Sequence, residues 1–147
     1  MKKHTRIVTQ ILKSYYRDLA LIALFERQLE VLNYGLSENK LITDIEKEKI
    51  LKKIDSIKRK IKTLKFNNCQ IDLIMESIRK TNKNDCEILD MRFKKGFLNS
   101  KISIILNYNE STIWQRENDL YEYIYQALDD ESIEDAKKKS NNESNNL

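Results

Sequence analysis

Apolar residues recur every three or four positions along most of this 147-residue chain, which is the spacing of one face of an α-helix. Residues 5–34 form the first such stretch and predict a helix of roughly eight turns. Its apolar positions are Ile7, Val8, Ile11, Leu12, Tyr15, Leu19, Ile22, Phe25, Leu29 and Leu32. Gly35 follows directly, and a left-handed glycine commonly ends a helix, so we expect this helix to end there.

A second long helix is predicted to begin at Thr43, because Thr43 and Glu46 have the spacing of a capping box. Its apolar positions, in steps of four and three, are Ile50, Ile54, Ile57, Ile61, Leu64, Ile71, Met75 and Ile78. This repeat favours helix pairing, either with the first helix in an antiparallel hairpin or with another chain in a coiled coil. Asn68 occupies an expected core position, so it either fixes the register of that pairing or marks a break in the helix.

The polar connector at residues 81–84 is the expected boundary between a helical arm (1–82) and a second domain (83–130). In the second domain, Asn84 and Glu87 have the spacing of a capping box, and Gly96 is expected to end the short helix that they begin. That helix holds Ile88, Leu89, Met91 and Phe93.

A further short helix is expected to start at Asn99 or Ser100, followed by a turn at residues 107–109 whose asparagines tolerate left-handed geometry. A longer helix is predicted from about Glu110. Its apolar face carries Ile113, Leu120, Ile124 and Leu128.

The composition favours an all-α fold, since two glycines and no proline leave few residues for the tight turns of a sheet protein. One histidine (His4) and two widely spaced cysteines (Cys69 and Cys86) provide no metal-ligand or catalytic pattern. Phosphate-binding loops and nucleophile elbows are absent from the sequence, and no apolar run reaches membrane-spanning length. We therefore expect a cytoplasmic protein that is not an enzyme and uses no cofactor or metal.

The net charge of +4 is unevenly placed along the chain. Residues 1–84 carry a net +9, residues 85–128 a net −2, and residues 129–147 a net −3. The window 91–116 alone carries a net +4, which places a basic patch inside a domain that is acidic in total. The acidic and polar tail, residues 131–147, holds little that could be buried and is expected to be disordered.

A short helix, a tight turn and a longer helix together predict a helix-turn-helix, in which the second helix enters the major groove of double-stranded DNA. Lys94, Lys95 and Lys101 are the expected phosphate contacts. The expected outward face of the longer helix, which would read base edges, consists of Ser111, Thr112, Gln115 and Arg116.

The sequence of residues 87–93, with Gly96, Phe97, residues 101–103 and residues 111–113, resembles region four of sigma-70-type factors. Together with the long helical arm, it is similar to small phage regulators of the RinA and ArpU type. That resemblance implies an activator of phage late or packaging genes that works with the RNA polymerase of a bacterial host.

Two other functions fit parts of the pattern. A small terminase-like subunit for DNA recognition and assembly also combines a helix-turn-helix with a coiled coil, although the opposite order of the two parts is expected there. A coiled-coil adaptor that never touches DNA is the second alternative. The arm is expected to mediate self-association or polymerase contact in the DNA-binding hypothesis, and Trp114 is expected to contribute to packing.

Overall fold

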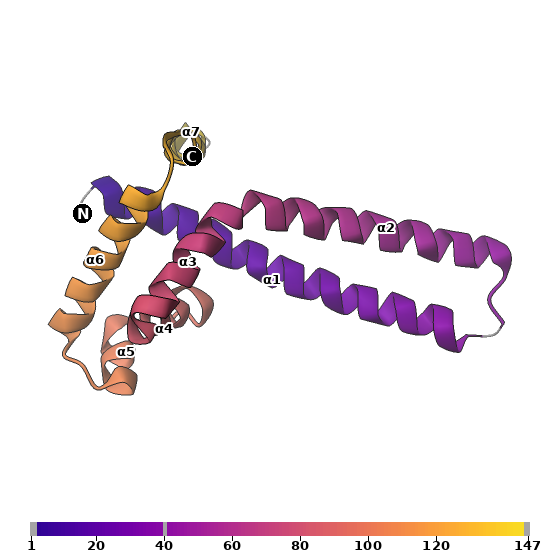
Figure 1. Cartoon of the computed structure of the whole chain (residues 1–147), viewed down its shortest axis with the longest axis horizontal. Helices are drawn as coiled ribbons and strands as arrows, with labels where there is room; N and C mark the ends of the chain where they lie inside the picture. Colours follow the sequence, from indigo (N-terminus) through magenta and orange to yellow (C-terminus); the bar gives the residue numbers. More distant parts are fainter. Residues whose placement is uncertain (1–2, 40, 146–147) are drawn as a thin grey trace. The chain divides into compact units, whose positions relative to one another are not determined.

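The structure, a computed structural model, describes residues 3–39 and 41–145. Every regular element in those residues is helical, as the periodicity predicts (Figure 1). In chain order the elements are α1 (Lys3–Glu38), α2 (Asp44–Asn67), α3 (Cys69–Thr81), α4 (Lys83–Leu89), the π-helical turn η1 (Asp90–Lys94), α5 (Asn99–Leu106), α6 (Glu110–Ala127) and α7 (Asp130–Asn145).

The chain divides into two compact units. The arm unit is Arg17–Cys69, and the head unit combines Met1–Tyr16 with Gln70–Leu147. The divisions therefore fall within α1 and at the start of α3, whereas the sequence suggests a boundary at the connector 81–84. The first turns of α1 and the whole amphipathic stripe of α3 belong to the head unit because their apolar residues are buried there.

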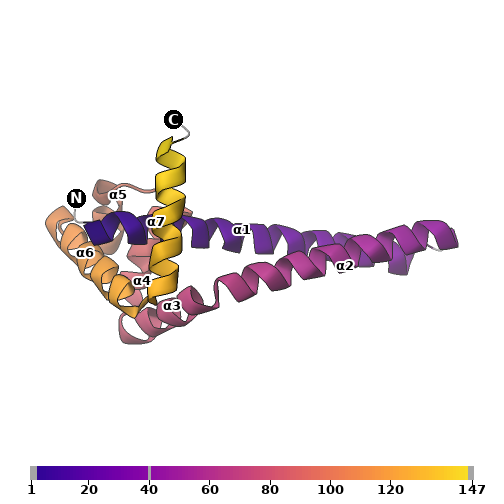
Figure 2. The same cartoon turned by 90° about the horizontal axis from the view of Figure 1, so that it is seen from above.

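The head unit has a deep core. Figure 2 shows α3, α4 and α6 gathered around the first part of α1. Its fully buried side chains are Val8, Leu12, Met75, Ile88, Leu89, Ile102, Ile113 and Ile124. Two buried tyrosines extend this core: the Tyr15 hydroxyl donates to Asp72 over 2.6 Å and the Tyr16 hydroxyl donates to Asp90 over 2.6 Å. Apolar burial provides most of the stability here, and both tyrosine hydroxyls have partners.

Helix α4 begins two residues earlier than the sequence suggests. The side chain of Asn82, in extended backbone, accepts from the amides of Asn84 and Asp85, so Asn82 is the N-cap and the expected capping role of Asn84 is wrong. The helix continues into η1, a π-helical turn that the apolar spacing does not indicate. Gly96 then adopts φ +71°, which confirms it as the left-handed residue that follows this helical segment.

In the arm unit, the second half of α1 and α2 run antiparallel within one chain (Figure 1). The capping box of Thr43 and Glu46 is present as predicted. Gly35 does not end α1, however; it lies inside the helix, which continues to Glu38, and its carbonyl accepts from the amide of Asn39. Glycine permits the left-handed conformation without requiring it, and here the helical hydrogen bonds simply continue.

Asn68 combines both of the roles that the sequence leaves open. It ends α2 with its amide bonded to the carbonyl of Leu64, and α3 starts at the next residue. Its side chain is buried and donates to Asp18 over 2.9 Å, which ties the base of α2 to α1 within the arm unit. The helix therefore breaks at Asn68, and the same residue makes a specific polar contact across the hairpin.

Helix α7 occupies most of the tail for which the sequence predicts disorder. The carboxylate of Asp129 accepts from the Ser132 amide over 2.7 Å and so caps the helix. Ile133 and Ala136, three residues apart, are both buried. The structure differs from that expectation because Ile133 and Ala136 are buried, and a short helix is stabilised mainly by the packing of its apolar face. Residues 146–147 of the expected tail lie outside the described residues.

Candidate nucleic-acid interface

Helices α4, α5 and α6 pack around a small apolar cluster in the head unit. Ile88, Ile102 and Ile113, one from each helix, are completely buried, and Met91, Phe97, Leu106 and Tyr108 pack against them. The turn between α5 and α6 is closed by Asn107 in the left-handed conformation (φ 59°), as its residue type predicts. Since the buried faces are fixed by this cluster, the cluster also determines which side chains α5 and α6 expose.

The outward face of α6 carries two of the predicted base-reading residues. Ser111 and Gln115 are both exposed and, four residues apart, share one face of the helix. The Gln115 amide donates to Asp119 over 3.2 Å, one turn further along the same side. Thr112 is half-buried beside them. The structure therefore presents Ser111 and Gln115 to solvent and Thr112 only in part.

Arg116 lies elsewhere on α6. Its guanidinium contacts the Asp85 carboxylate of α4 at 3.1 Å and lies 4.6 Å from the centre of the Tyr108 ring. The Tyr108 hydroxyl in turn accepts from the Asn84 side chain over 3.0 Å. Sequence analysis places Arg116 on the outward face with Gln115, whereas the structure places it on the flank of α6 that meets α4.

The three predicted phosphate-contacting lysines are all exposed. Two of them share an aromatic neighbour: the ammonium groups of Lys95 and Lys101 lie 5.9 Å and 3.9 Å from the centre of the Phe97 ring. Phe97 is anchored on the apolar cluster, and its amide donates to the carbonyl of Met91 over 3.0 Å. A fixed ring thus brings together two lysines that are six positions apart in the sequence.

The basic patch of residues 91–116 is smaller than its formal charge indicates. Arg92 is paired with Glu117 at 2.6 Å, and Glu117 is only 7% exposed. Arg116 is paired with Asp85. Both arginines are therefore neutralised inside the head unit by carboxylates that lie outside the 91–116 window. Lys94, Lys95 and Lys101 supply the exposed positive charge of the patch.

Two residues of this surface escaped the sequence analysis. The Tyr108 ring packs against the guanidinium of Arg116, and the Asp85 carboxylate forms an ion pair with it.

Trp114, which was expected to pack, is 59% exposed on α6. The prediction for Trp114 is wrong because the side chain next to a core residue on a helix points about 100° away from it.

The remaining unusual groups of the head unit are buried. Burial raises the pKa of the Cys86 thiol, and the neighbouring Asp90 carboxylate raises it further. A thiol in this state is a poor nucleophile. Among the residues that the structure describes, no three potential His, Cys, Asp or Glu ligands lie close enough to hold a metal ion.

No protein-family model, curated protein or solved structure matches this chain. No helix in the described part of the chain is both long and apolar enough to cross a membrane.

Proposed function

We propose that this protein is a sequence-specific DNA-binding transcription regulator in which α5, the turn at residues 107–109 and α6 act as a helix-turn-helix. The observation that carries this proposal is the arrangement around α6. Its buried face is fixed by Ile113 against α4 and α5, while Ser111 and Gln115 are presented to solvent. Lys95, directly after η1, and Lys101, in α5, both lie near the Phe97 ring. Polar side chains on an exposed helix with nearby cations suit base and phosphate contacts respectively.

The proposed interface divides the work between two groups of residues. Lys94, Lys95 and Lys101 bind phosphates and provide affinity that falls with salt. Ser111, Thr112 and Gln115 read base edges, for which glutamine suits adenine. Arg116 completes the reading face in this proposal, and to reach a guanine it exchanges the Asp85 carboxylate for the base.

The resemblance to sigma region four and to RinA- and ArpU-type regulators narrows the proposal to a phage activator of late or packaging genes. Such a protein works in the cytoplasm of a bacterial host with the host RNA polymerase. This part rests on residues 87–113 and on the presence of a helical arm, and it is tested by transcription in vitro from phage promoters with and without the protein.

The direct test of DNA binding uses fluorescence anisotropy with random and phage promoter duplexes over a range of salt concentrations. Replacing Lys94, Lys95 and Lys101 by alanine is expected to weaken binding to all sequences, and to reduce the slope of log affinity against log salt by about 2.7, or about 0.9 per lost phosphate contact. The matched control removes the same charge at Lys137, Lys138 and Lys139 in α7 and is expected to change the slope little.

A second measurement tests the reading face. Gln115→Ala and Arg116→Ala are each expected to cost about 1–3 kcal/mol on the preferred sequence and little on random DNA. Unchanged footprints with both variants would show that another face of the head unit meets DNA. Absence of binding to any duplex at low salt would instead favour the coiled-coil adaptor.

A further inference from the structure

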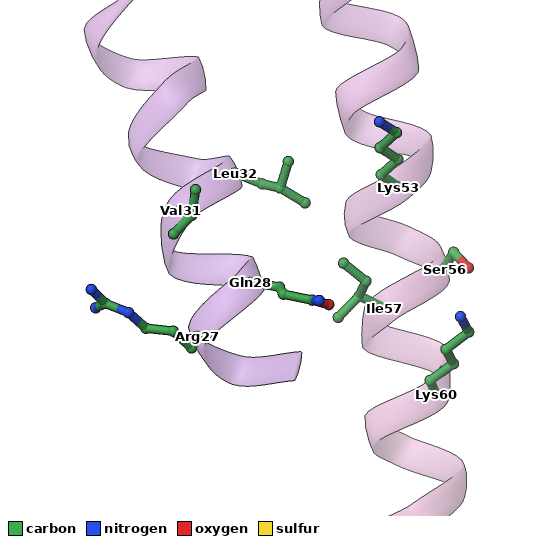
Figure 3. A pocket seen from close by; sticks show the side chains of 8 residues that line it. All are labelled: Arg27, Gln28, Val31, Leu32, Lys53, Ser56, Ile57 and Lys60. Carbon is green, nitrogen blue, oxygen red and sulfur yellow. The ribbon is translucent and has the colours of Figure 1, made fainter. Parts of the chain in front are cut away.

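Hollows open on both units of this chain, and they differ in what lines them. Figure 3 shows one of about 510 Å³ in the arm unit, between α1 and α2. Its walls place Arg27 and Lys53 beside Val31 and Ile57, a mixture of charged and apolar side chains that selects no particular ligand. A smaller hollow of about 210 Å³ lies in the head unit, where residues of the proposed DNA interface and their neighbours line it. The polar groups of the smaller hollow therefore bear on how that interface works.

Arg116 lines the smaller hollow together with two carboxylates, those of Asp85 on α4 and Asp119 on α6. The Nη1 atom of Arg116 is 3.1 Å from Oδ1 of Asp85, and these side chains are 33% and 20% exposed. The pair is partly withdrawn from water, where a charge-assisted hydrogen bond is stronger than at an open surface. Asp119 accepts from the Gln115 side chain over 3.2 Å. In the free protein, carboxylates thus hold both Gln115 and Arg116.

The groups that hold Arg116 are fixed in place, whereas Arg116 itself has a long and flexible side chain. Asp85 lies in the first turn of α4, and its backbone amide donates to the Asn82 side chain over 3.4 Å. The Tyr108 ring lies 4.6 Å from the guanidinium and packs against the apolar cluster, and its hydroxyl accepts from Asn84 over 3.0 Å. Asp85 and Tyr108 therefore form a preformed site for the guanidinium, which Arg116 can leave by rotation of its own side chain.

We propose that Asp85 is an autoinhibitory residue that withholds Arg116 from DNA until a guanine replaces its carboxylate. This inference rests on the proposed function, in which α6 reads base edges. Guanine O6 and N7 accept two hydrogen bonds from one guanidinium, whereas the contact with Asp85 joins one nitrogen to one carboxylate oxygen. An aligned guanine therefore displaces Asp85, and on other sequences Arg116 keeps its contact with the carboxylate.

This contact lowers the affinity for the preferred sequence and keeps Arg116 out of binding elsewhere. On the preferred sequence, the affinity is reduced to the fraction of molecules in which Arg116 has left Asp85. On other sequences, Arg116 adds no charge to the phosphate contacts of Lys94, Lys95 and Lys101. A purely structural ion pair between α4 and α6 would behave differently, because breaking it would loosen the interface and weaken binding to every duplex.

The test compares Asp85→Asn with the wild type by fluorescence anisotropy, on a random duplex and on the phage promoter duplex that the wild type binds most tightly. Asparagine keeps a side-chain oxygen and nearly the same shape but removes the charge that holds the guanidinium. The affinity for the promoter duplex is expected to rise by about tenfold, because Arg116 is free before binding. On the random duplex, the slope of log affinity against log salt should steepen by about 0.9, because the freed arginine contacts one more phosphate.

Glu87→Gln is the matched control. Glu87 is an acid of the same helix, two positions after Asp85, and residues two apart on a helix do not face each other. This variant removes the same charge and should leave the salt slope on the random duplex unchanged. In an Arg116→Ala background, the gain from Asp85→Asn should disappear. An equal gain in Glu87→Gln, or a gain that persists without Arg116, would show that loss of negative charge alone strengthens binding and would overturn the proposal.

A further measurement leaves Asp85 unchanged and so does not depend on the folding of Asp85→Asn, which circular dichroism would check. Arg116→Ala alone should not alter the salt slope on the random duplex, since Arg116 contacts Asp85 there rather than a phosphate. A slope that falls by about 0.9 would show that Arg116 is already free and would overturn the proposal.

The outcomes also separate this proposal from the proposed function. Wild-type binding that Asp85→Asn leaves unchanged or weakens would overturn the autoinhibitory role of Asp85 alone. Absence of binding by the wild type and all variants to every duplex at low salt would overturn the proposed function, and the role of Asp85 with it.

Discussion

In the head unit the 18-residue helix α6 buries five side chains, whereas in the arm unit the 24-residue helix α2 buries two. Both helices have an apolar stripe of similar regularity. They differ because α6 has neighbours on more than one side, among them α4 and α5, while α2 has only the second half of α1 within its unit. The amphipathic spacing provides apolar side chains that can be buried, and the number of helices packed around them determines how many are buried.

The polar groups of the two units differ in the same way. The head unit contains partly buried pairs such as Arg92 with Glu117, whereas in the arm the pair of Lys65 with Glu26 is exposed on both sides. Exposed ion pairs contribute little to stability. In a buried pair, removal of one partner leaves the other charge buried and unpaired, which lowers the free energy of unfolding strongly. The head unit should therefore respond sharply to single substitutions, and the arm unit weakly.

The largest expected difference comes from the two cores. Ile113→Ala in the head unit should reduce the free energy of unfolding by about 2–5 kcal/mol, because it leaves a cavity in a fully buried cluster. Leu29→Ala, at a half-buried position of the arm, should cost only about 1 kcal/mol. Urea unfolding would be followed by circular dichroism, which reports the helices of both units, and by the fluorescence of Trp114, the single tryptophan, which reports the head unit. Equal losses would contradict the comparison.

Breaking the buried ion pair should have the next largest effect. Arg92→Ala leaves Glu117 almost buried without its partner and is expected to cost about 3 kcal/mol. Lys65→Ala, which breaks the exposed pair with Glu26, should change stability by less than about 0.5 kcal/mol. The two single variants can be compared by thermal unfolding. A smaller loss for Arg92→Ala than for Lys65→Ala would show that burial does not control these pairs.

Tyr16 makes the head unit sensitive to alkaline pH. Burial raises the pKa of its hydroxyl above the ordinary value of 10.0, and its hydrogen bond to Asp90 raises it further. The native state keeps a proton that the unfolded state releases above pH 10, so the free energy of unfolding should fall as the pH rises through that value. Tyr16→Phe should cost about 1.5 kcal/mol at neutral pH and reduce this alkaline loss, as chemical denaturation at several pH values would show. If the free energy of unfolding of the variant fell as much above pH 10 as that of the wild type, groups other than Tyr16 would cause the fall.

The two glycines provide the smallest and most closely matched comparison. Gly96→Ala should destabilise the head unit by about 1 kcal/mol, because φ is +71° at this position. Gly35→Ala should stabilise the arm by about 0.5–1 kcal/mol, since Gly35 is inside α1 and an added Cβ meets open space. Circular dichroism melts of both variants would check the opposite signs. A loss of stability in Gly35→Ala would indicate that this residue needs glycine for a reason other than its backbone.

Features that depend on neighbouring residues could be predicted from the sequence. The helical stripes, the capping box of Thr43 and Glu46, the left-handed Gly96 and Asn107, and the start of α6 at Glu110 all agree with the structure. Each of these rests on backbone preferences or on hydrogen bonds within a few positions. Ser111 and Gln115 share one exposed face of α6 for the same reason, since they are four residues apart on the helix.

Features that depend on distant partners were decided by tertiary structure alone. For Arg116 the sequence does indicate a position beside the buried face of α6, because this residue lies three positions after Ile113 and four before Leu120. Its contacts with Asp85 and Tyr108, however, come from another helix and from a turn. The same holds for the burial of Glu117 against Arg92, for the break at Asn68 with its bond to Asp18, and for the buried face of α7. Local sequence determined where the helices of this protein form, while packing between residues far apart in the chain determined which of their charges remain free to meet a partner.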